Sequence, residues 1–214
     1  MDVTMSKTAI KICGIKNTAE ASWLPEEVDY AGFVLFYPKS RRNITPEDAK
    51  EAFSALKDGI KKVAVTVKPT LSQVLEIEKA GFDYVQIHGE VEEKIFGNTS
   101  IPIIKAFNVS DLSELEKYSR NERIHAFVFD SAVPGSGKSF DWERVNKPDT
   151  FGKPVILAGG LNPGNVAHAI ETIHPYGVDV SSGVEGENGK DEGKIKAFVQ
   201  AVRNIDGGKL FAGE

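Results

Sequence analysis

The two residues best suited to chemistry in this sequence are a thiol and a carboxyl group, each at the end of a short apolar run. Cys13 closes the run Ala-Ile-Lys-Ile-Cys, and Asp130 closes the run Ala-Phe-Val-Phe-Asp. If both runs are parallel strands, their carboxyl ends lie at the same edge of the sheet, where active sites are built. Their unperturbed pKa values are about 8.5 and about 3.9. The pair could act as base and acid in an isomerisation if the site lowers the first pKa and raises the second.

Two short turns of small residues could bind a phosphate group. Gly159 and Gly160 follow one late apolar run, and Ser182 and Gly183 follow the next. Glycine lets a phosphate oxygen approach backbone N–H groups closely. The loops after the seventh and eighth strands form the common phosphate site of (β/α)₈ barrels. Two such turns at these places therefore favour phosphate binding over tight turns alone.

Further polar side chains stand near predicted strand ends. Gln86 and His88 close a fourth apolar run, and Asp179 lies in the eighth, where side chains often point into the mouth of a barrel. Arg41 and Arg42 follow the second run, and arginine suits bidentate binding of a carboxylate or phosphate. A packed histidine and solvated arginines are the alternatives for these residues.

The segment 134–139, Pro-Gly-Ser-Gly-Lys-Ser, ends like a nucleotide-binding P-loop. The full pattern needs another glycine, and Ala132 stands at that place. A Gly-rich loop over a barrel site, with Lys138 reaching a substrate anion, is the better interpretation.

Eight apolar runs, rich in Val, Ile and Phe, read as strands that are buried on both faces. They alternate with helical patterns, which implies a parallel sheet. Eight units favour an α/β fold with one closed (β/α)₈ (TIM) barrel over residues 1–214, with a doubly wound open sheet as the alternative. The predicted strands are Ala9–Cys13, Tyr30–Phe36, Lys62–Val67, Tyr84–His88, Ile103–Phe107, Ala126–Asp130, Val155–Ala158 and Val178–Ser181.

Capping residues predict where several helices begin and end. Thr45-Pro46 and Asn162-Pro163 each read as an N-cap followed by the first helical residue. Gly81 is a plausible C′ glycine. The last helix, over 191–205, is expected to stop at Gly207-Gly208.

Composition limits the class of protein. The chain has 214 residues, of which 41% are hydrophobic and 27% charged, as in an ordinary soluble globular protein. A net charge of −5 argues against a general nucleic-acid binder, and no apolar run approaches the length of a membrane span. A single cysteine fits the reducing cytoplasm. The sequence leaves open whether the chain is a monomer or a homodimer.

With these residues in place, the chain resembles the phosphoribosylanthranilate isomerase family. The similarity runs in order from the first predicted strand to the eighth and covers nearly the whole chain. The blocks that carry it are Lys-Ile-Cys-Gly at 11–14, Gly-Phe-Val-Leu-Phe at 32–36, Gln-Ile-His-Gly at 86–89, Gly-Lys-Ser-Phe-Asp-Trp at 137–142, Leu-Ala-Gly-Gly-Leu at 157–161 and Asp-Val-Ser-Ser-Gly-Val-Glu at 179–185.

The resemblance implies an Amadori rearrangement in tryptophan synthesis. N-(5-phosphoribosyl)anthranilate would become 1-(2-carboxyphenylamino)-1-deoxyribulose 5-phosphate, with Asp130 as general acid and Cys13 as general base. Gly159, Gly160, Ser182 and Gly183 would meet the phosphate, and neither a metal nor an organic cofactor is expected.

The family also implies an arginine for the anthranilate carboxylate. By register this residue is Arg42, while Arg41 stands where the family usually has proline. The related isomerase of histidine synthesis is an alternative, although it has Asp where Cys13 stands. A non-catalytic phosphosugar-binding barrel is another.

Overall fold

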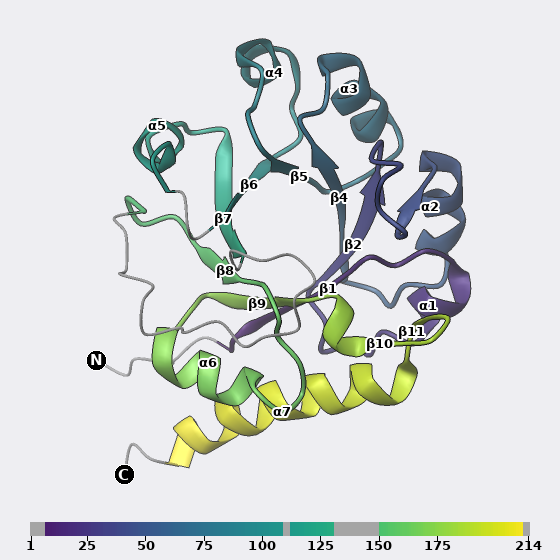
Figure 1. The fold of residues 1–214 in the computed structure, drawn as a ribbon, viewed down its shortest axis with the longest axis vertical. Coiled ribbons are helices and arrows are strands. Elements are labelled where there is room, and N and C mark those ends of the chain that lie inside the picture. The colour runs from purple at the N-terminus through teal and green to yellow at the C-terminus, as the bar shows by residue number, and fades with distance from the viewer. Residues whose placement is uncertain (1–6, 109–111, 131–149, 212–214) are drawn as a thin grey trace.

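A computed structural model describes residues 7–108, 112–130 and 150–211 of the chain. Their main sheet is parallel and closes on itself, because β1 pairs with β2 on one side and with β9 on the other. The short strands β10 and β11 form a separate antiparallel pair. Figure 1 looks into this ring, with helices around its outside. The eight barrel strands are β1 (Ala9–Cys13), β2 (Tyr30–Leu35), β4 (Lys61–Val67), β5 (Tyr84–His88), β6 (Ile103–Asn108), β7 (Ile124–Asp130), β8 (Val155–Leu157) and β9 (Gly177–Val180).

The predicted closed barrel is thus confirmed, and the open-sheet alternative is wrong. Each predicted strand is present: Ala9–Cys13 and Tyr84–His88 have the predicted bounds, and no end of the others differs by more than two residues. The helices of the described residues are α1 (Thr18–Ser22), α2 (Pro46–Phe53), α3 (Leu71–Lys79), α4 (Glu93–Asn98), α5 (Leu115–Ser119), α6 (Val166–Ile173) and α7 (Glu192–Phe211). Short elements complete them: β3 (Asn43–Ile44), the 3₁₀ helix η2 (Ser182–Val184), β10 (Glu185–Gly186) and β11 (Gly189–Lys190).

Alternation along the strands divides the core into two parts. In β1, Ile10 and Ile12 join the large cluster that packs under the helices, whereas Ala9 and Cys13 join a smaller cluster inside the barrel. Successive side chains of a strand point to opposite faces, so both faces of the sheet are buried. This explains why the strand sequences lack a polar face.

Two predicted helix boundaries hold and two are wrong. Thr45 caps α2 with a capping box, and Gly81 follows α3 with a φ of 88°. Asn162-Pro163 does not start α6, which begins at Val166, because the Asn162 side chain accepts a hydrogen bond from the Gly164 N–H and forms a local turn.

The last helix also runs past its predicted stop. Helix α7 continues through Gly207 to Phe211. Its final turns are tied to the start of β1, since the Asp206 carboxylate accepts hydrogen bonds from the Thr8 N–H and hydroxyl. This tertiary anchor outweighs the cost of about 1 kcal/mol for a helical glycine. No helix within the described ranges is long and apolar enough to cross a membrane.

Candidate active site

The carboxyl ends of the barrel strands bring the predicted acid and base to one opening. Cys13 is the last residue of β1 and belongs to the inner cluster of the barrel. Asp130 is the last residue of β7, in step with the inward-facing Ala126 and Val128. The parallel strands end at the same rim, so thiol and carboxyl group both stand at the mouth of the barrel.

Below Cys13, the inside of the barrel holds a buried ion pair. Lys11 lies two residues earlier on the same face of β1, and its Nζ is 2.7 Å from Asp179 Oδ2 on the neighbouring β9. The other carboxylate oxygen, Asp179 Oδ1, is buried and has no hydrogen-bond partner among the described residues. It is available to accept a hydrogen bond from a bound ligand.

The pKa of the Cys13 thiol differs from the sequence-based expectation. Burial raises this pKa, and the attraction of Lys11 for the thiolate offsets only part of the effect. The lowered thiol pKa that an acid–base pair would need is therefore not found in the structure, because burial of the strand end outweighs the charge of Lys11.

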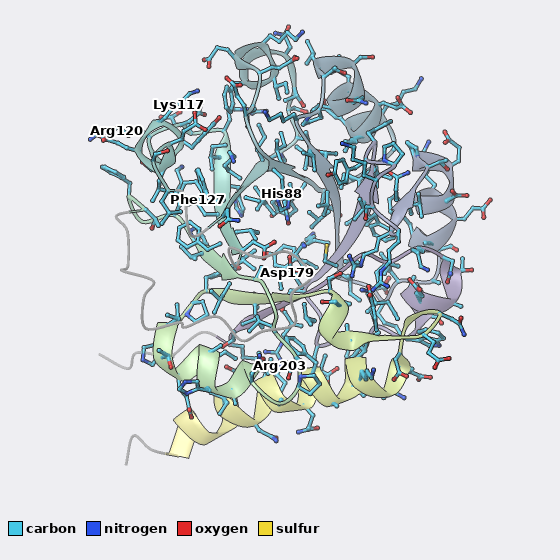
Figure 2. All side chains as sticks on the ribbon, viewed as in Figure 1. His88, Lys117, Arg120, Phe127, Asp179 and Arg203 are labelled. Carbon is cyan, nitrogen blue, oxygen red and sulfur yellow. The ribbon has the colours of Figure 1, made fainter. Side chains whose placement is uncertain are left out.

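Gln86 and His88 lie on the inner face of β5. Their side chains meet, with 2.9 Å between Gln86 Nε2 and His88 Nε2. Gln86 Oε1 is buried, and no described residue forms a hydrogen bond with it. Burial, with the nearby Lys11 and Lys105 charges, lowers the pKa of His88 to about 4. This imidazole is therefore neutral near pH 7. Figure 2 shows His88 and Asp179 within the ring of strands.

The two glycine turns after β8 and β9 lie against each other. Gly159 and Gly160 have φ values of 88° and 68°, which favour glycine. A Cβ added at Gly183 would overlap the carbonyl oxygen of Leu161, so the second turn packs directly on the first. Ser182 and Gly183 belong to η2 at this contact. The predicted phosphate residues thus form one continuous backbone surface.

The loop after β2 carries the two arginines to a single carboxylate. Arg42 Nε and Nη2 lie 2.5 and 2.9 Å from the two carboxylate oxygens of Glu185, and Arg41 also binds Glu185. Arg42 is the more buried of the two, with 23% of its side chain exposed against 71% for Arg41. Its side chain crosses Gly14, next to Cys13, where a Cβ would overlap it. Arg42 is the arginine that lies beside Cys13, the predicted base.

Glu185 also binds Lys190, whose Nζ lies 2.9 Å from Oε1. Burial alone would raise the pKa of Glu185, but hydrogen bonds and charge from Arg42 and Lys190 lower it to about 2. Sequence reasoning assigned no role to Lys11, Glu185 or Lys190. A lysine inside an otherwise apolar strand was a readable signal for Lys11, whereas nothing in the sequence pairs Glu185 with a loop 143 residues away.

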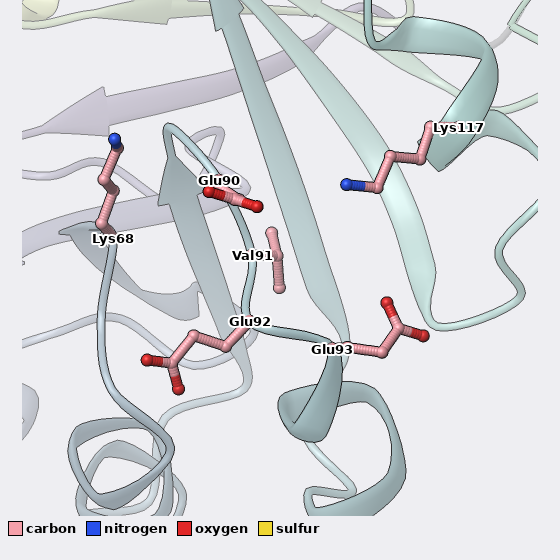
Figure 3. A pocket seen from close by; sticks show the side chains of 6 residues that line it. All are labelled: Lys68, Glu90, Val91, Glu92, Glu93 and Lys117. Atoms are coloured by element: carbon pink, nitrogen blue, oxygen red, sulfur yellow. The ribbon is translucent and has the colours of Figure 1, made fainter.

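A separate hollow of about 370 Å³ lies beside the loops that follow β4 and β5 (Figure 3). It contains none of the predicted site residues. Its walls are Lys68, Glu90, Val91, Glu92, Glu93 and Lys117.

Two predicted features of the site lie outside the described residues. They are the Gly-rich segment 134–139 and Lys138 within it. Within the described ranges, no group of three or more His, Cys, Asp or Glu side chains could hold a metal ion.

Known proteins resemble this chain over nearly its whole length. The family model for N-(5'-phosphoribosyl)anthranilate (PRA) isomerase matches residues 10–201. The N-(5'-phosphoribosyl)anthranilate isomerase of Streptococcus pneumoniae strain R6 is 40% identical over 202 residues, which is 92% of this chain and 96% of that protein. The enzyme of the same name from Aquifex aeolicus is 39% identical over 203 residues, covering 91% and 98% of the two chains.

Solved structures show the same likeness. The phosphoribosyl anthranilate isomerase of Thermotoga maritima superimposes with a TM-score of 0.80 at 36% identity, over 92% of this chain and 99% of that one. Another phosphoribosyl anthranilate isomerase structure, with a TM-score of 0.77 at 34% identity and the same coverage, holds reduced 1-(o-carboxyphenylamino)-1-deoxyribulose 5-phosphate.

Proposed function

Since the chain belongs to the N-(5'-phosphoribosyl)anthranilate isomerase family and acts as an isomerase in tryptophan biosynthesis, we propose that Asp130 is its general acid and Cys13 its general base. The observation that carries this assignment is the position of the two side chains. They end β7 and β1 on the inner face of one closed barrel, at the same rim. Membership of this family favours N-(5'-phosphoribosyl)anthranilate as the substrate over the substrate of the histidine-pathway isomerase.

The reaction needs one proton donor and one proton acceptor. The Asp130 carboxylic acid gives its proton to the ribose ring oxygen, the C1–O bond breaks, and the ring opens to a protonated imine. The Cys13 thiolate then takes the proton from C2. The electrons of the C2–H bond form a C1–C2 double bond, and those of the C–N double bond return to nitrogen, which gives an enolamine. Tautomerisation to the ketone completes the rearrangement. Only protons move to and from the substrate, so the balance requires no redox cofactor.

Both ends of the substrate are anions, and each has a place at the rim. The phosphate would bind the backbone surface formed by Gly159, Gly160, Ser182 and Gly183. The anthranilate carboxylate would bind Arg42, whose bonds to Glu185 use Nε and Nη2. Arg42 lies beside Cys13, which keeps the reacting carbons near the base.

The ribose would bind between these ends. Asp179 Oδ1 and Gln86 Oε1 are buried acceptors that find no partner in the described part of the chain, and ribose hydroxyl groups are suitable donors for them. The neutral imidazole of His88, in hydrogen-bond contact with Gln86, is a further polar group on the same inner face of β5.

Turnover of phosphoribosylanthranilate by two variants tests the acid and the base. The substrate is made in situ, and the loss of its fluorescence is followed with purified protein. We expect Asp130→Asn and Cys13→Ala each to lose on the order of 10²–10⁴ in turnover, with unchanged circular dichroism. Cys13→Ser should keep a trace of activity. Near-normal turnover of Asp130→Asn or Cys13→Ala would refute the role of that residue.

We also infer that the chain works in the cytoplasm as a monomer or homodimer. A structure of monomers generated from the dimeric isomerase of Thermotoga maritima resembles this chain with a TM-score of 0.76. Sedimentation equilibrium at several concentrations would decide between the two states, and a mass above that of a dimer would contradict both.

A further inference from the structure

Lys11 is a buried cation that the proposed proton transfers do not use. It stands in the middle of β1 with only 1% of its surface exposed, and it points into the barrel between Ala9 and Cys13. Placing an ammonium group in a protein interior is unfavourable unless charged partners compensate it. Inside this barrel, two groups next to Lys11 can compensate its charge.

The first partner is the Asp179 carboxylate. Lys11 and Asp179 are direct neighbours in the register of β1 and β9, and Nζ lies 2.7 Å from Oδ2. Burial alone would lower the pKa of Lys11, but Asp179 and Cys13 together outweigh burial and raise it. Lys11 therefore keeps its proton throughout the neutral pH range.

The second partner is the thiol of Cys13. A Cβ added at Gly32, on the adjacent strand, would lie 3.0 Å from Cys13 Sγ and 3.2 Å from Lys11 Nζ. The missing side chain at Gly32 thus leaves a space that thiol and ammonium share. Lys11 interacts directly with the thiol, and its charge is the largest effect that opposes the burial of the thiolate.

Other charged groups also act on Cys13, from three elements. Asp179 of β9 disfavours the thiolate, and Lys190 of β11 favours it. Arg42, from the loop after β2, crosses the adjacent Gly14 and is itself influenced by Cys13. Lys190 and Arg42 both bind Glu185, whereas Lys11 binds Asp179 and lies next to the thiol.

From this arrangement we infer that Lys11 is a positioning residue for the base: its fixed ammonium compensates the negative charge of the Cys13 thiolate, and Asp179 holds it in place. The inference rests on the proposed role of Cys13. The thiol proton leaves to solvent before the C2 proton is taken, and Lys11 neither gives nor receives a proton. The inner surface of β1 thus supplies both the base and its counter-charge.

The test uses the fact that Cys13 is the only cysteine of the chain. Thiolate absorbance at 240 nm is titrated in wild type and in Lys11→Met, with Cys13→Ser as the baseline. Removing an opposite charge at this range should move the thiol titration upward by about one to three pH units. The rising limb of the pH profile of kcat should move upward by the same amount, which a merely structural role would not produce.

A second variant covers the case in which Lys11→Met leaves Asp179 as an unpaired buried charge and does not fold. Lys11→Met/Asp179→Asn removes both charges, a change that is often tolerated in folded proteins. The midpoint of its thiol titration should still lie at a higher pH than that of Asp179→Asn alone, since only Lys11 distinguishes the two proteins.

The outcomes separate this inference from the proposed function. A thiol titration that is unchanged in Lys11→Met, or equal in Asp179→Asn and the double variant, overturns the role of Lys11 whatever Cys13 does in the reaction. Normal turnover by Cys13→Ala instead overturns Cys13 as the base, independently of the Lys11 titration.

Discussion

The carboxylate of Glu185 binds Arg42 with both oxygens, at 2.5 Å from Nε and 2.9 Å from Nη2. The contact joins the loop after β2 to the segment that follows the glycine turn of η2. It thereby fixes the proposed carboxylate-binding arginine relative to the proposed phosphate-binding turn. A substrate with an anion at each end requires such a fixed separation.

Glu185→Gln should therefore raise KM by about three- to tenfold, which corresponds to about 0.7–1.4 kcal/mol of lost binding, with a smaller change in kcat. The amide keeps the shape but loses the charge that orders Arg42, and it leaves the buried Lys190 without its counter-ion. Steady-state kinetics separates the two parameters. A lower KM would show instead that Glu185 competes with the substrate for Arg42.

Arg42→Ala and Arg41→Ala test which arginine binds the anthranilate carboxylate. Loss of a charge-assisted hydrogen bond costs about 1.5–3 kcal/mol, so Arg42→Ala should raise KM by about ten- to a hundredfold. Arg41→Ala is the matched control. Its side chain is 71% exposed, and exposed ion pairs contribute little, so KM should change by less than about threefold. The reverse order of effects would place the carboxylate on Arg41.

Gly183→Ala tests the phosphate surface. The new Cβ would overlap the Leu161 carbonyl oxygen, and neither backbone can move without separating the two turns. We expect KM to rise by at least about tenfold, a loss of about 1.4 kcal/mol, and inhibition by inorganic phosphate to weaken in parallel. Gly186→Ala is the control on the same segment, because its Cβ would lie 3.6 Å from the nearest atom. Equal effects of both substitutions would contradict a specific role of Gly183.

The barrel could be predicted from the sequence because burial on both faces leaves a continuous apolar run in each strand. The candidate base, acid, glycine turns and inward polar residues followed from their places at strand ends. Interactions between distant segments could not be predicted. Three examples depend on packing between residues that are distant in the sequence. Asp206 binds Thr8 and so prolongs α7, Glu185 forms an ion pair with Arg42, and burial raises the pKa of Cys13.

Lys105 offers a test of buried charge outside the barrel interior. It alternates with the inward-facing Ile104 and Ala106 of β6 and is only 2% exposed. Its Nζ donates a hydrogen bond of 2.6 Å to the Ala106 carbonyl oxygen and lies 4.2 and 5.1 Å from the ring centres of Phe107 and Tyr118. No carboxylate of the described residues forms an ion pair with it.

Burial, only partly offset by the charge of Glu114, lowers the pKa of Lys105 to about 8. An unfolded lysine has a pKa of about 10.4. Between these values the unfolded chain holds the extra proton, so this lysine makes stability rise with pH, and the contribution is lost as the pH falls towards 8.

Lys105→Met should remove that dependence while it fills the aromatic pocket. The free energy of unfolding of wild type minus that of Lys105→Met should therefore increase between pH 8 and pH 10, by at most about 1.4 kcal/mol per pH unit. Urea unfolding at three pH values in the presence of a reductant measures this difference, and the exposed Lys79→Met controls for the loss of a lysine. A difference that stays constant over this range would mean that Lys105 remains protonated in the folded protein, with the two aromatic rings and the carbonyl oxygen sufficient to hold its charge.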